Sequence, residues 1–425
     1  MSFQSLSFVI IGGGITGLST GIQLARAGHS VVVLESSPCV SETGAGIQLM
    51  PNAARILYKL GSREYLEEFA VRPHGLVVRR YVNGEVLSQL DFDGAVERYG
   101  IPFYNIHRRH LIQHLFDLAI QSKVHVRFNA TVSSIELGGT APSITLTSGE
   151  EIAGDVLIGA DGVHSVARRF LAGNIAEMTT ITGDAAYRAV VPVEKLLSDP
   201  DLAPLITTPE VTCWLGPGRH VVGYCISGRT EYNIVLVTHP DVGSAESWKL
   251  EGSADVMRND FADWDPSVTK ILKLVDKTYR WKLIDREPLK SWHDPSGRLI
   301  LIGDACHPLL PYRAQGAAMG IEDAAVLGEL FSRISSIHEL PVLASAFQKL
   351  RSPRCEQAQQ ASRANQHIFH LPDGPMQLAR DDRLKESFIS EAERKAIFEY
   401  DPAAEVAAWR EGETQNRVLT SPSVQ

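Results

Sequence analysis

The chain has 425 residues, with 41 lysines and arginines against 50 aspartates and glutamates, so its formal net charge at pH 7 is -9. Nucleic acids and anionic membranes bind clustered positive charge, so this balance argues against both as partners. An apolar fraction of 44% is typical of soluble globular proteins, and the length indicates two or three subdomains.

The first predicted elements are a strand, a helix and a second strand. Residues 7–11 form a short β-branched run, and the motif Gly12-x-Gly14-x-x-Gly17 follows it. Apolar residues at helical spacing come next, and the buried run 30–34 ends at Glu35. The whole unit has about the 30 residues that a dinucleotide-binding βαβ unit needs.

Each glycine of this motif has a separate physical role. Gly12 permits a tight turn, Gly14 lets the backbone approach a pyrophosphate, and Gly17 lets the helix pack closely on the strands. The helix N-terminus offers unpaired N–H groups and the positive end of its dipole to the phosphate. Glu35 can accept hydrogen bonds from an adenosine ribose and would repel a 2′-phosphate, which argues against bound NADP. The motif alone does not separate FAD from NAD.

Two later apolar strands also end in a glycine–aspartate pair. One runs from residue 155 into Asp161-Gly162, with Ser165 and Arg168 in the following turn and helix. The other runs from residue 298 into Gly303-Asp304, and a loop rich in proline and glycine then leads into a helix. Three separate strand ends therefore carry residues suited to a bound nucleotide.

Together these motifs resemble the flavoprotein monooxygenases of the aromatic-hydroxylase type, also called group A, which share the para-hydroxybenzoate-hydroxylase-like fold. The resemblance spans about residues 6 to 365, and within the group it is strongest to the salicylate-hydroxylase-like branch, including its fungal secondary-metabolite members. The features typical of that branch are Gly44-Ala-Gly46-Ile47, Pro51-Asn52-Ala53, His107-Arg108-x-x-Leu111, Tyr187-Arg188-Ala189 and Pro311-Tyr-Arg-Ala-Gln-Gly316.

The resemblance implies that the nucleotide is FAD. It implies that Gly12, Gly14, Gly17, Glu35 and Gly46 belong to the cofactor site. Arg108 would reach the FAD phosphates and ribityl region, and Asp304 would bind a ribityl hydroxyl. Asp161 and Gly162 would support FAD and the passing NAD(P)H, and Gly316 and Ala317 would open a helix facing the flavin. A helix N-terminus there would stabilise the negative charge of reduced flavin.

The middle of the chain is predicted to form an antiparallel sheet. Residues 186–192, 211–215, 220–226 and 232–237 are short, β-branched or alternating runs separated by glycine and proline turns. In the resembling family such a sheet forms the floor of the substrate pocket, which makes Arg188 and Tyr224 the candidate catalytic residues. The alternatives are that Arg188 lies in an ion pair at the sheet edge and that Tyr224 packs in the core.

Two positions near the third motif need separate treatment. The family commonly has glycine where this chain has Ala314. An alanine would be strained there if the position needs a positive φ, so we expect instead that the loop is slightly altered. His307 follows Asp304 closely and could look catalytic, but we expect it to make a structural hydrogen bond at the strand end.

The predicted fold class is α/β: a Rossmann-like FAD-binding domain interleaved with an antiparallel-sheet substrate domain and followed by a C-terminal helical segment. The expected FAD-binding domain is discontinuous, and the last segment, helical from about residue 386 to 409, could cover the pocket, pack on the FAD domain or contact another subunit. The expected boundaries are 1–75, 100–180 and 285–365 for the FAD-binding domain, 76–99 and 181–284 for the substrate domain, and 366–425 for the C-terminal extension.

The expected function is insertion of one oxygen atom from O2 into a phenolic or polycyclic aromatic substrate, with NAD(P)H as reductant and a C4a-hydroperoxyflavin as oxidant. A flavoprotein reductase or dehydrogenase on the same fold is the alternative, and a non-catalytic dinucleotide-binding protein is a third. NADH and NADPH are not distinguished, because the visiting reductant leaves no second fingerprint. The expected assembly is a monomer or a homodimer.

The five cysteines are scattered and lack metal-ligand spacing, which favours free thiols in a reducing compartment and predicts no metal site. Few residues precede the first strand, which leaves no room for a signal peptide. No apolar run approaches the roughly 20 residues of a membrane-spanning helix. We therefore expect a cytoplasmic protein without a membrane-spanning segment.

Overall fold

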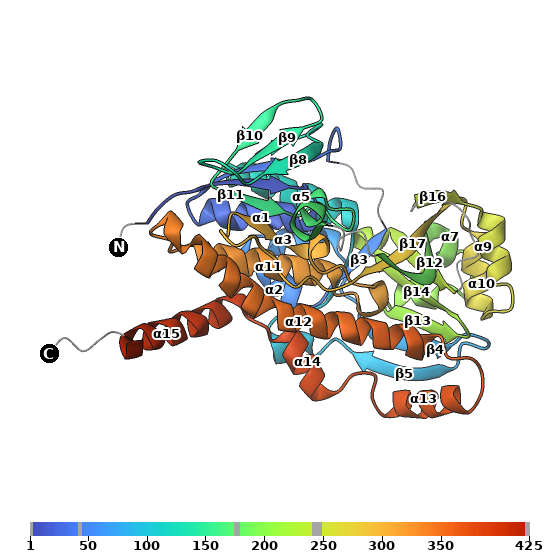
Figure 1. The fold of residues 1–425 in the computed structure, drawn as a ribbon. Coiled ribbons are helices and arrows are strands. Elements are labelled where there is room, and N and C mark those ends of the chain that lie inside the picture. Colours follow the sequence, from blue (N-terminus) through green and yellow to red (C-terminus); the bar gives the residue numbers. More distant parts are fainter. Residues whose placement is uncertain (1–2, 41–44, 174–178, 240–248, 421–425) are drawn as a thin grey trace.

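The computed structural model describes residues 3–40, 45–173, 179–239 and 249–420. A parallel sheet with its helices lies beside a larger sheet, and C-terminal helices run along both (Figure 1). The α/β fold class predicted from the sequence is confirmed. Gly44 of the branch motif and the last five residues of the predicted extension lie outside the described residues.

The first sheet has five parallel strands in the order β18-β11-β1-β2-β7. All of its strands are short, and all but β7 are apolar. Their buried side chains share one hydrophobic core with those of the adjoining helices and of a small antiparallel sheet. Helix α1 (Ile15–Arg26) packs against both α5 (Arg108–Gln121) and α11 (Gly316–Phe331). The strands are β1 (Ser7–Ile11), β2 (Ser30–Leu34), β7 (His125–Arg127), β11 (Val156–Gly159) and β18 (Leu299–Leu301).

Parallel pairing brings the carboxyl ends of these strands to one edge of the sheet. Gly12 follows β1, Glu35 follows β2, Asp161 follows β11 and Asp304 follows β18. Ligands of open α/β sheets bind outside this edge, so the topology brings the three predicted motifs together.

The second sheet has eight strands in the order β16-β17-β12-β15-β14-β13-β4-β5. It is antiparallel as predicted, except that β4 and β13 run parallel, which the sequence did not indicate. Strands β4 and β5 come from residues 75–91 and complete this sheet beside strands of residues 179–286. The strands are β4 (Gly75–Arg80), β5 (Val86–Asp91), β12 (Thr179–Pro192), β13 (Val211–Gly216), β14 (Arg219–Ile226), β15 (Glu231–Thr238), β16 (Lys249–Gly252) and β17 (Thr278–Arg286).

Two smaller sheets complete the strand inventory of the described chain. One is the antiparallel sheet β10-β9-β8, and the other pairs β3 with β6 between the two large sheets. The domain boundaries expected from the sequence remain a proposal. The smaller strands are β3 (Gly46–Leu49), β6 (Tyr104–His107), β8 (Val132–Glu136), β9 (Ser143–Leu146) and β10 (Glu151–Ala153).

Short helices connect the strands of both sheets. Among the described residues, none of the helices combines the length and the apolar character that a membrane-spanning segment requires. The connecting helices are α2 (Pro51–Lys59), α3 (Arg63–Phe69), α4 (Ala95–Tyr99), α6 (Val166–Ala172), α7 (Val193–Leu197), α8 (Pro204–Thr207), α9 (Ala254–Asp260) and α10 (Pro266–Lys273). The 3-10 turns are η2 (Ser227–Arg229), η3 (Gly303–Ala305), η4 (Pro311–Arg313) and η5 (Ile337–Glu339).

The C-terminal part is helical, with more interruptions than predicted. Helix α12 (Leu340–Phe369) ends before the predicted break at residues 371–375, and α13 (Pro375–Glu386) follows it. The stretch 386–409 is not one helix. It is divided into α14 (Glu391–Phe398) and α15 (Pro402–Thr420), because the residue before a proline disfavours helical conformation and proline itself suits a first helical turn.

Candidate functional site

The turn after β1 has the geometry that the glycine motif predicts. Gly12 has a φ of +105°, and a side chain there would collide with the backbone of Ala160. A side chain at Gly17 would collide with the carbonyl oxygen of Gly12. At Gly14 no atom lies within 4 Å of such a side chain, so the N-terminus of α1 is open to a ligand.

Glu35 organises the neighbouring loops at the end of β2. Its carboxylate accepts hydrogen bonds from the backbone N–H groups of Gly13, at 2.9 Å, and Ser37, at 2.8 Å. Beside it is a hollow of about 180 Å³ with Gly14 and Phe128 among its lining residues. The hollow joins an acidic strand end to an apolar wall, a combination that suits the ribose and base of a nucleotide.

A larger cavity of about 410 Å³ lies between the two large sheets. Among the predicted cofactor residues, the ones that line it are Gly14, Gly46, Arg108, Gly162, Asp304, Gly316 and Ala317. The carboxyl of Asp304 is open to this cavity, but protein surrounds the cavity on most sides. This burial raises the pKa of Asp304, and the positive charge of Arg108 acts to lower it. The N-terminal residues of α11 border the same space, and a side chain added at Gly316 would meet no atom within 4 Å.

Asp161 contacts its own loop more than the cavity. Its carboxylate accepts hydrogen bonds from the Ser165 hydroxyl at 2.5 Å and from the Val166 N–H at 2.7 Å, at the start of α6. Burial raises its pKa, although these hydrogen bonds favour the ionised form. The adjacent Gly162 lines the cavity. Asp161 therefore shapes the loop that borders the cavity, and its role toward FAD stays a prediction.

Arg188 on β12 and Tyr224 on β14 both line the cavity from the eight-stranded sheet. The sheet register pairs Arg188 with Val235 of β15 and pairs Tyr224 with Asn233 of the same strand. Because Val235 and Asn233 are two residues apart, the side chains of Arg188 and Tyr224 lie on the same face of the sheet. The Arg188 guanidinium lies 5.3 Å from the centre of the Trp281 ring. Burial raises the pKa of Tyr224, and the charge of Arg188 acts in the opposite direction.

Gly46, on β3, lies where the predicted cofactor residues meet the eight-stranded sheet. Its N–H donates a hydrogen bond to Oδ1 of Asn233 at 2.7 Å. A side chain at this position would come within 2.5 Å of the Tyr224 ring. Gly46 lines the cavity as predicted for a cofactor residue, but the structure also gives it a second requirement, which is space for Tyr224.

The comparisons with known proteins agree with this geometry. Residues 5–362 match the family described as FAD binding domain. The chain is 37% identical over 383 residues to the FAD-dependent monooxygenase OpS4 of Beauveria bassiana (strain ARSEF 2860), which covers 90% of this chain and 89% of that protein. It is 36% identical over 378 residues to the 3-amino-4-hydroxybenzoate 2-monooxygenase PtmB3 of Streptomyces platensis, with 88% and 90% covered.

The chain belongs to the family of FAD-dependent monooxygenases. The crystal structure of CtdE in complex with FAD and substrate has the same fold, with a TM-score of 0.84 at 21% identity over 98% of this chain and all of that chain. A salicylate hydroxylase substrate complex has a TM-score of 0.79 at 23% identity, with 95% of this chain and 97% of that chain covered. The family predicted from the sequence is thus confirmed, and FAD is its cofactor.

The residues present fit this cofactor. The motif glycines leave the N-terminus of α1 open to a pyrophosphate, and the neighbouring hollow is of a size and character for the adenosine. In the larger cavity Asp304 and Arg108 offer an acceptor and a cation to the ribityl and phosphate groups. The first residues of α11 would then present backbone N–H groups to the flavin ring.

Ala314 has a left-handed backbone conformation, which glycine adopts more readily than alanine. Its φ is 51° and its ψ is 33°, so the loop keeps the left-handed turn despite the alanine. The strained left-handed conformation is therefore the one observed, not the altered loop that we expected, and its cost is about 1 kcal/mol or more in an L-residue.

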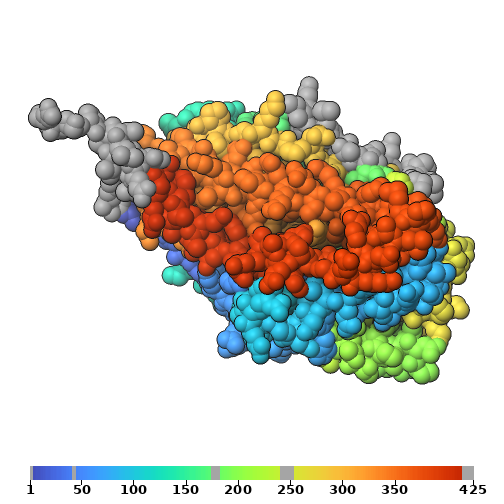
Figure 2. Space-filling view, turned by 90° about the horizontal axis from the view of Figure 1, so that it is seen from below, coloured from blue at the N-terminus to red at the C-terminus, as the bar shows by residue number. Residues whose placement is uncertain are grey.

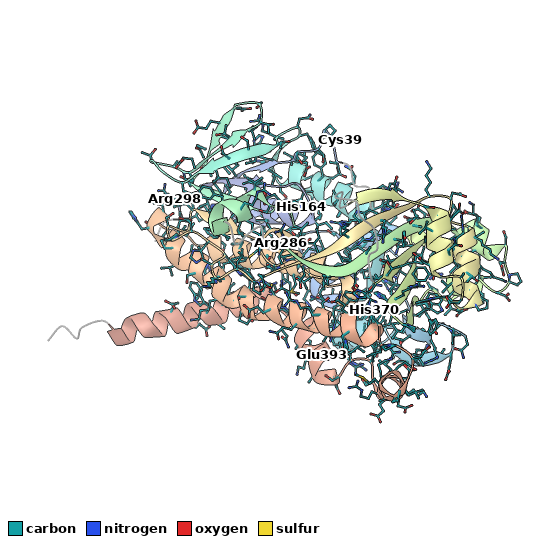
Figure 3. The ribbon with its side chains drawn as sticks, turned by 45° about the vertical axis from the view of Figure 1, so that its right-hand side comes forward. Cys39, His164, Arg286, Arg298, His370 and Glu393 are labelled. Atoms are coloured by element: carbon teal, nitrogen blue, oxygen red, sulfur yellow. The ribbon has the colours of Figure 1, made fainter. Side chains whose placement is uncertain are left out.

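The sequence analysis missed His220 as a cavity residue. It lies four positions before Tyr224 on β14 and lines the same cavity. Its Nδ1 is 2.9 Å from Nε2 of His370, which follows α12 and is labelled in Figure 3. Burial lowers the pKa of His220 well below its ordinary value, so it is neutral at physiological pH. The alternation of His220, Val222 and Tyr224 is the signal that could have identified it.

His307 makes the structural contact that was expected of it. Its Nε2 is 2.6 Å from a carboxylate oxygen of the buried Asp323, which also accepts from Arg351 at 2.7 Å. The charges of His307 and Arg351 outweigh the effect of burial and hold the pKa of Asp323 at about 2. Cys355 is near enough to complete three potential metal ligands, but the Arg351 guanidinium already neutralises the carboxylate.

Proposed function

We propose that this enzyme inserts one oxygen atom from O2 into a phenolic or polycyclic aromatic substrate, with NAD(P)H as the reductant. The observation that carries this proposal is the position of Arg188 and Tyr224, which line the same cavity as Asp304 and the N-terminus of α11. The relatives named as hydroxybenzoate monooxygenases support an aromatic substrate.

The residues of the chain would act on the substrate rather than on the oxidant. FAD, when bound, would supply the redox chemistry that activates O2 with reducing equivalents from NAD(P)H. Arg188 would stabilise the phenolate form of the substrate, which raises the electron density of the ring. Tyr224, whose raised pKa keeps its hydroxyl protonated, would donate a hydrogen bond to the same oxygen and fix the ring position.

The remaining groups of the cavity would control charge and water. Backbone N–H groups at the start of α11 would stabilise negative charge that develops near them. The apolar side chains of the cavity, among them Phe103 and Phe398, would exclude water and so limit unproductive release of hydrogen peroxide.

Turnover under labelled oxygen tests this function directly. The purified FAD-loaded enzyme should oxidise NAD(P)H faster when a phenol such as salicylate is added, and should consume O2. Mass spectrometry after turnover under ¹⁸O₂ should find one labelled oxygen in the product. Unlabelled product, or equal turnover without O2, would instead favour a reductase or dehydrogenase, and a preparation without flavin would favour a binding protein.

A cytoplasmic location and a monomeric or homodimeric assembly remain parts of this proposal. The five cysteines are unpaired, and four of them are buried, which supports a reducing compartment. Size-exclusion chromatography with light scattering measures the assembly.

A further inference from the structure

The C-terminal extension contributes one side of the cavity. Phe388 and Ile389, from the loop after α13, and Ile397 and Phe398, from α14, all line it. We call these four side chains the C-terminal wall. Phe398 is 3% exposed and Ile389 is 8% exposed, so both are buried against the rest of the protein.

The wall continues into aromatic side chains from a distant part of the chain. The Phe398 ring packs edge-on against Phe103, with ring centres 5.2 Å apart, and against Tyr99 at 5.3 Å. Phe103 in turn stacks on Phe92 at 3.8 Å, and both of these rings also line the cavity. In the space-filling view the C-terminal residues form a band across this face, next to residues of the first quarter of the chain (Figure 2).

Two arginines hold the end of α14 in place. Arg354 donates to the carbonyl oxygens of Ala396, at 2.8 Å, and Ile397, at 3.0 Å. Arg55 donates to the carbonyl oxygen of Phe398 at 2.9 Å. These are C-terminal helix carbonyls without partners inside the helix, so a cation stabilises both the hydrogen bonds and the helix dipole.

Ionic contacts connect the wall to the loop before α11. Glu393 of α14, labelled in Figure 3, pairs with Arg313 at 2.7 Å. Arg354 also pairs with the buried Glu322, which accepts a hydrogen bond from Asn52. The Asn52 amide reaches Gln315, a residue lining the cavity. The wall is therefore a fixed part of the cavity and not a tail resting on its surface.

The two sides of the cavity differ in chemistry. The sheet floor carries Arg188, Tyr224 and His220, whereas the C-terminal wall and the adjoining rings are wholly apolar. A ligand that satisfies both sides has a polar oxygen at one end and an apolar part, such as a further ring, at the other.

We propose that the C-terminal wall determines the size of the aromatic ligand that the cavity admits and receives the apolar part of the substrate. The nature of that ligand rests on the proposed function. Removal of a wall ring should favour larger ligands, and a larger side chain in the wall should exclude them.

The test compares one-ring and two-ring phenols on the FAD-loaded enzyme. The probes are salicylate and 1-hydroxy-2-naphthoate, and the change in flavin absorbance gives each Kd without turnover. The wall variants are Phe388→Ala and Phe398→Ala, with Ile389→Trp as the filling variant. The matched control is Leu378→Ala on α13, an apolar residue of the same extension that is 58% exposed.

In Phe388→Ala and Phe398→Ala the preference for the naphthoate over salicylate should rise at least fivefold, and in Ile389→Trp it should fall by a similar factor. The control should stay within twofold of the unmodified enzyme. An unchanged preference in all three wall variants would overturn the proposal, and Phe388→Ala and Ile389→Trp decide the matter if Phe398→Ala fails to fold.

Iodide quenching of the flavin fluorescence separates this inference from the proposed function. If neither phenol perturbs the flavin of the unmodified enzyme, the proposed function fails, while quenching still tests the wall. Phe388→Ala and Phe398→Ala should then raise the quenching constant at least twofold over Leu378→Ala. Equal constants would show that these two rings do not bound the space beside the flavin, which would overturn the proposal.

Discussion

Arg188 brings a positive charge to the floor of the cavity, and this charge opposes the effect of burial on the pKa of Tyr224. A hydrogen bond to a charged group contributes about 1.5–3 kcal/mol, so Arg188→Met should weaken the binding of salicylate about 10- to 100-fold at pH 8. Titration of the flavin absorbance measures this Kd. Arg280→Met, which changes an arginine on β17 that does not line the cavity, is the matched control, and equal effects of both variants would count against the role of Arg188.

Ala314 has a left-handed backbone conformation that residues with a Cβ atom disfavour. Because its φ is 51°, Ala314→Gly should raise the free energy of unfolding by about 1 kcal/mol. Ala325→Gly, inside the buried helix α11, should lower it by about the same amount or more, since glycine disfavours a helix interior. Urea denaturation compares the two, and a loss of stability in Ala314→Gly would show that the left-handed turn costs nothing.

At the scale of elements, helix α11 is buried along most of its length and carries two acidic residues into the core. Glu322 accepts from Arg351 at 2.8 Å, from Arg354 at 2.6 Å and from Asn52 at 2.7 Å, which joins α11 to α12 and α2. Such a network is stable only when every charge has its partner.

Glu322→Gln removes the negative charge and leaves two arginines with only part of their compensation. It should lower the free energy of unfolding by about 3 kcal/mol, as measured by urea denaturation. The control is Glu329→Gln, an exposed residue of the same helix, which should change stability by less than about 0.5 kcal/mol. Equal stability of the two variants would show that the ion pairs of Glu322 do not hold α12 against α11.

The contact of β14 with the end of α12 predicts a response to acid. Burial lowers the pKa of His220 well below 6.5. Burial also lowers the pKa of His370 to about 4; the charge of Asp184 acts to raise this second pKa, and His239 acts to lower it. Below pH 6.5 both histidines take up a proton in the unfolded chain but stay neutral in the folded one until the pH reaches their lowered pKa. The free energy of unfolding therefore falls as the pH falls through this range.

For His370 this loss is complete near pH 4 and amounts to about 3 kcal/mol. Urea unfolding of the unmodified protein and of His370→Gln at pH 7.5 and pH 4.5 measures it. The decline should be smaller in the variant by most of that amount, and parallel declines would show that the histidine is not buried in a neutral form.

At the scale of the molecule, the cofactor site is built from segments that lie far apart in the sequence. The cavity and the neighbouring hollow take residues from the parallel sheet, the eight-stranded sheet and the C-terminal extension. A ligand that binds only the folded state stabilises it by about 2.7 kcal/mol when its concentration is 100 times its Kd.

Removal of FAD should therefore lower the Tm, and added FAD should restore it in a concentration-dependent way. Riboflavin should restore less, because it lacks the adenosine that the Glu35 hollow would hold. Differential scanning fluorimetry of the stripped protein measures both. A Tm that does not depend on FAD would contradict the assignment of these two spaces to one cofactor.

The sequence by itself determined the motifs that lie within one strand, turn and helix. The glycine turn after β1, the aspartates after β11 and β18 and the strands of the middle region depend on local backbone conformation and on hydrophobic periodicity, which neighbouring residues carry. The family and its cofactor followed from these motifs and are confirmed, whereas the roles of Arg188, Tyr224 and the individual cofactor residues remain predictions.

Only the tertiary structure decided which distant residues meet. The contact of Gly46 with Tyr224, the parallel pairing of β4 with β13, the approach of His220 to His370 and the C-terminal wall all join residues far apart in the chain. Such contacts depend on strand register and on how helices lie over the sheets. The alternation along a strand indicates which of its side chains share a face, but which distant strand or helix lies against that face is decided by packing between segments far apart in the chain.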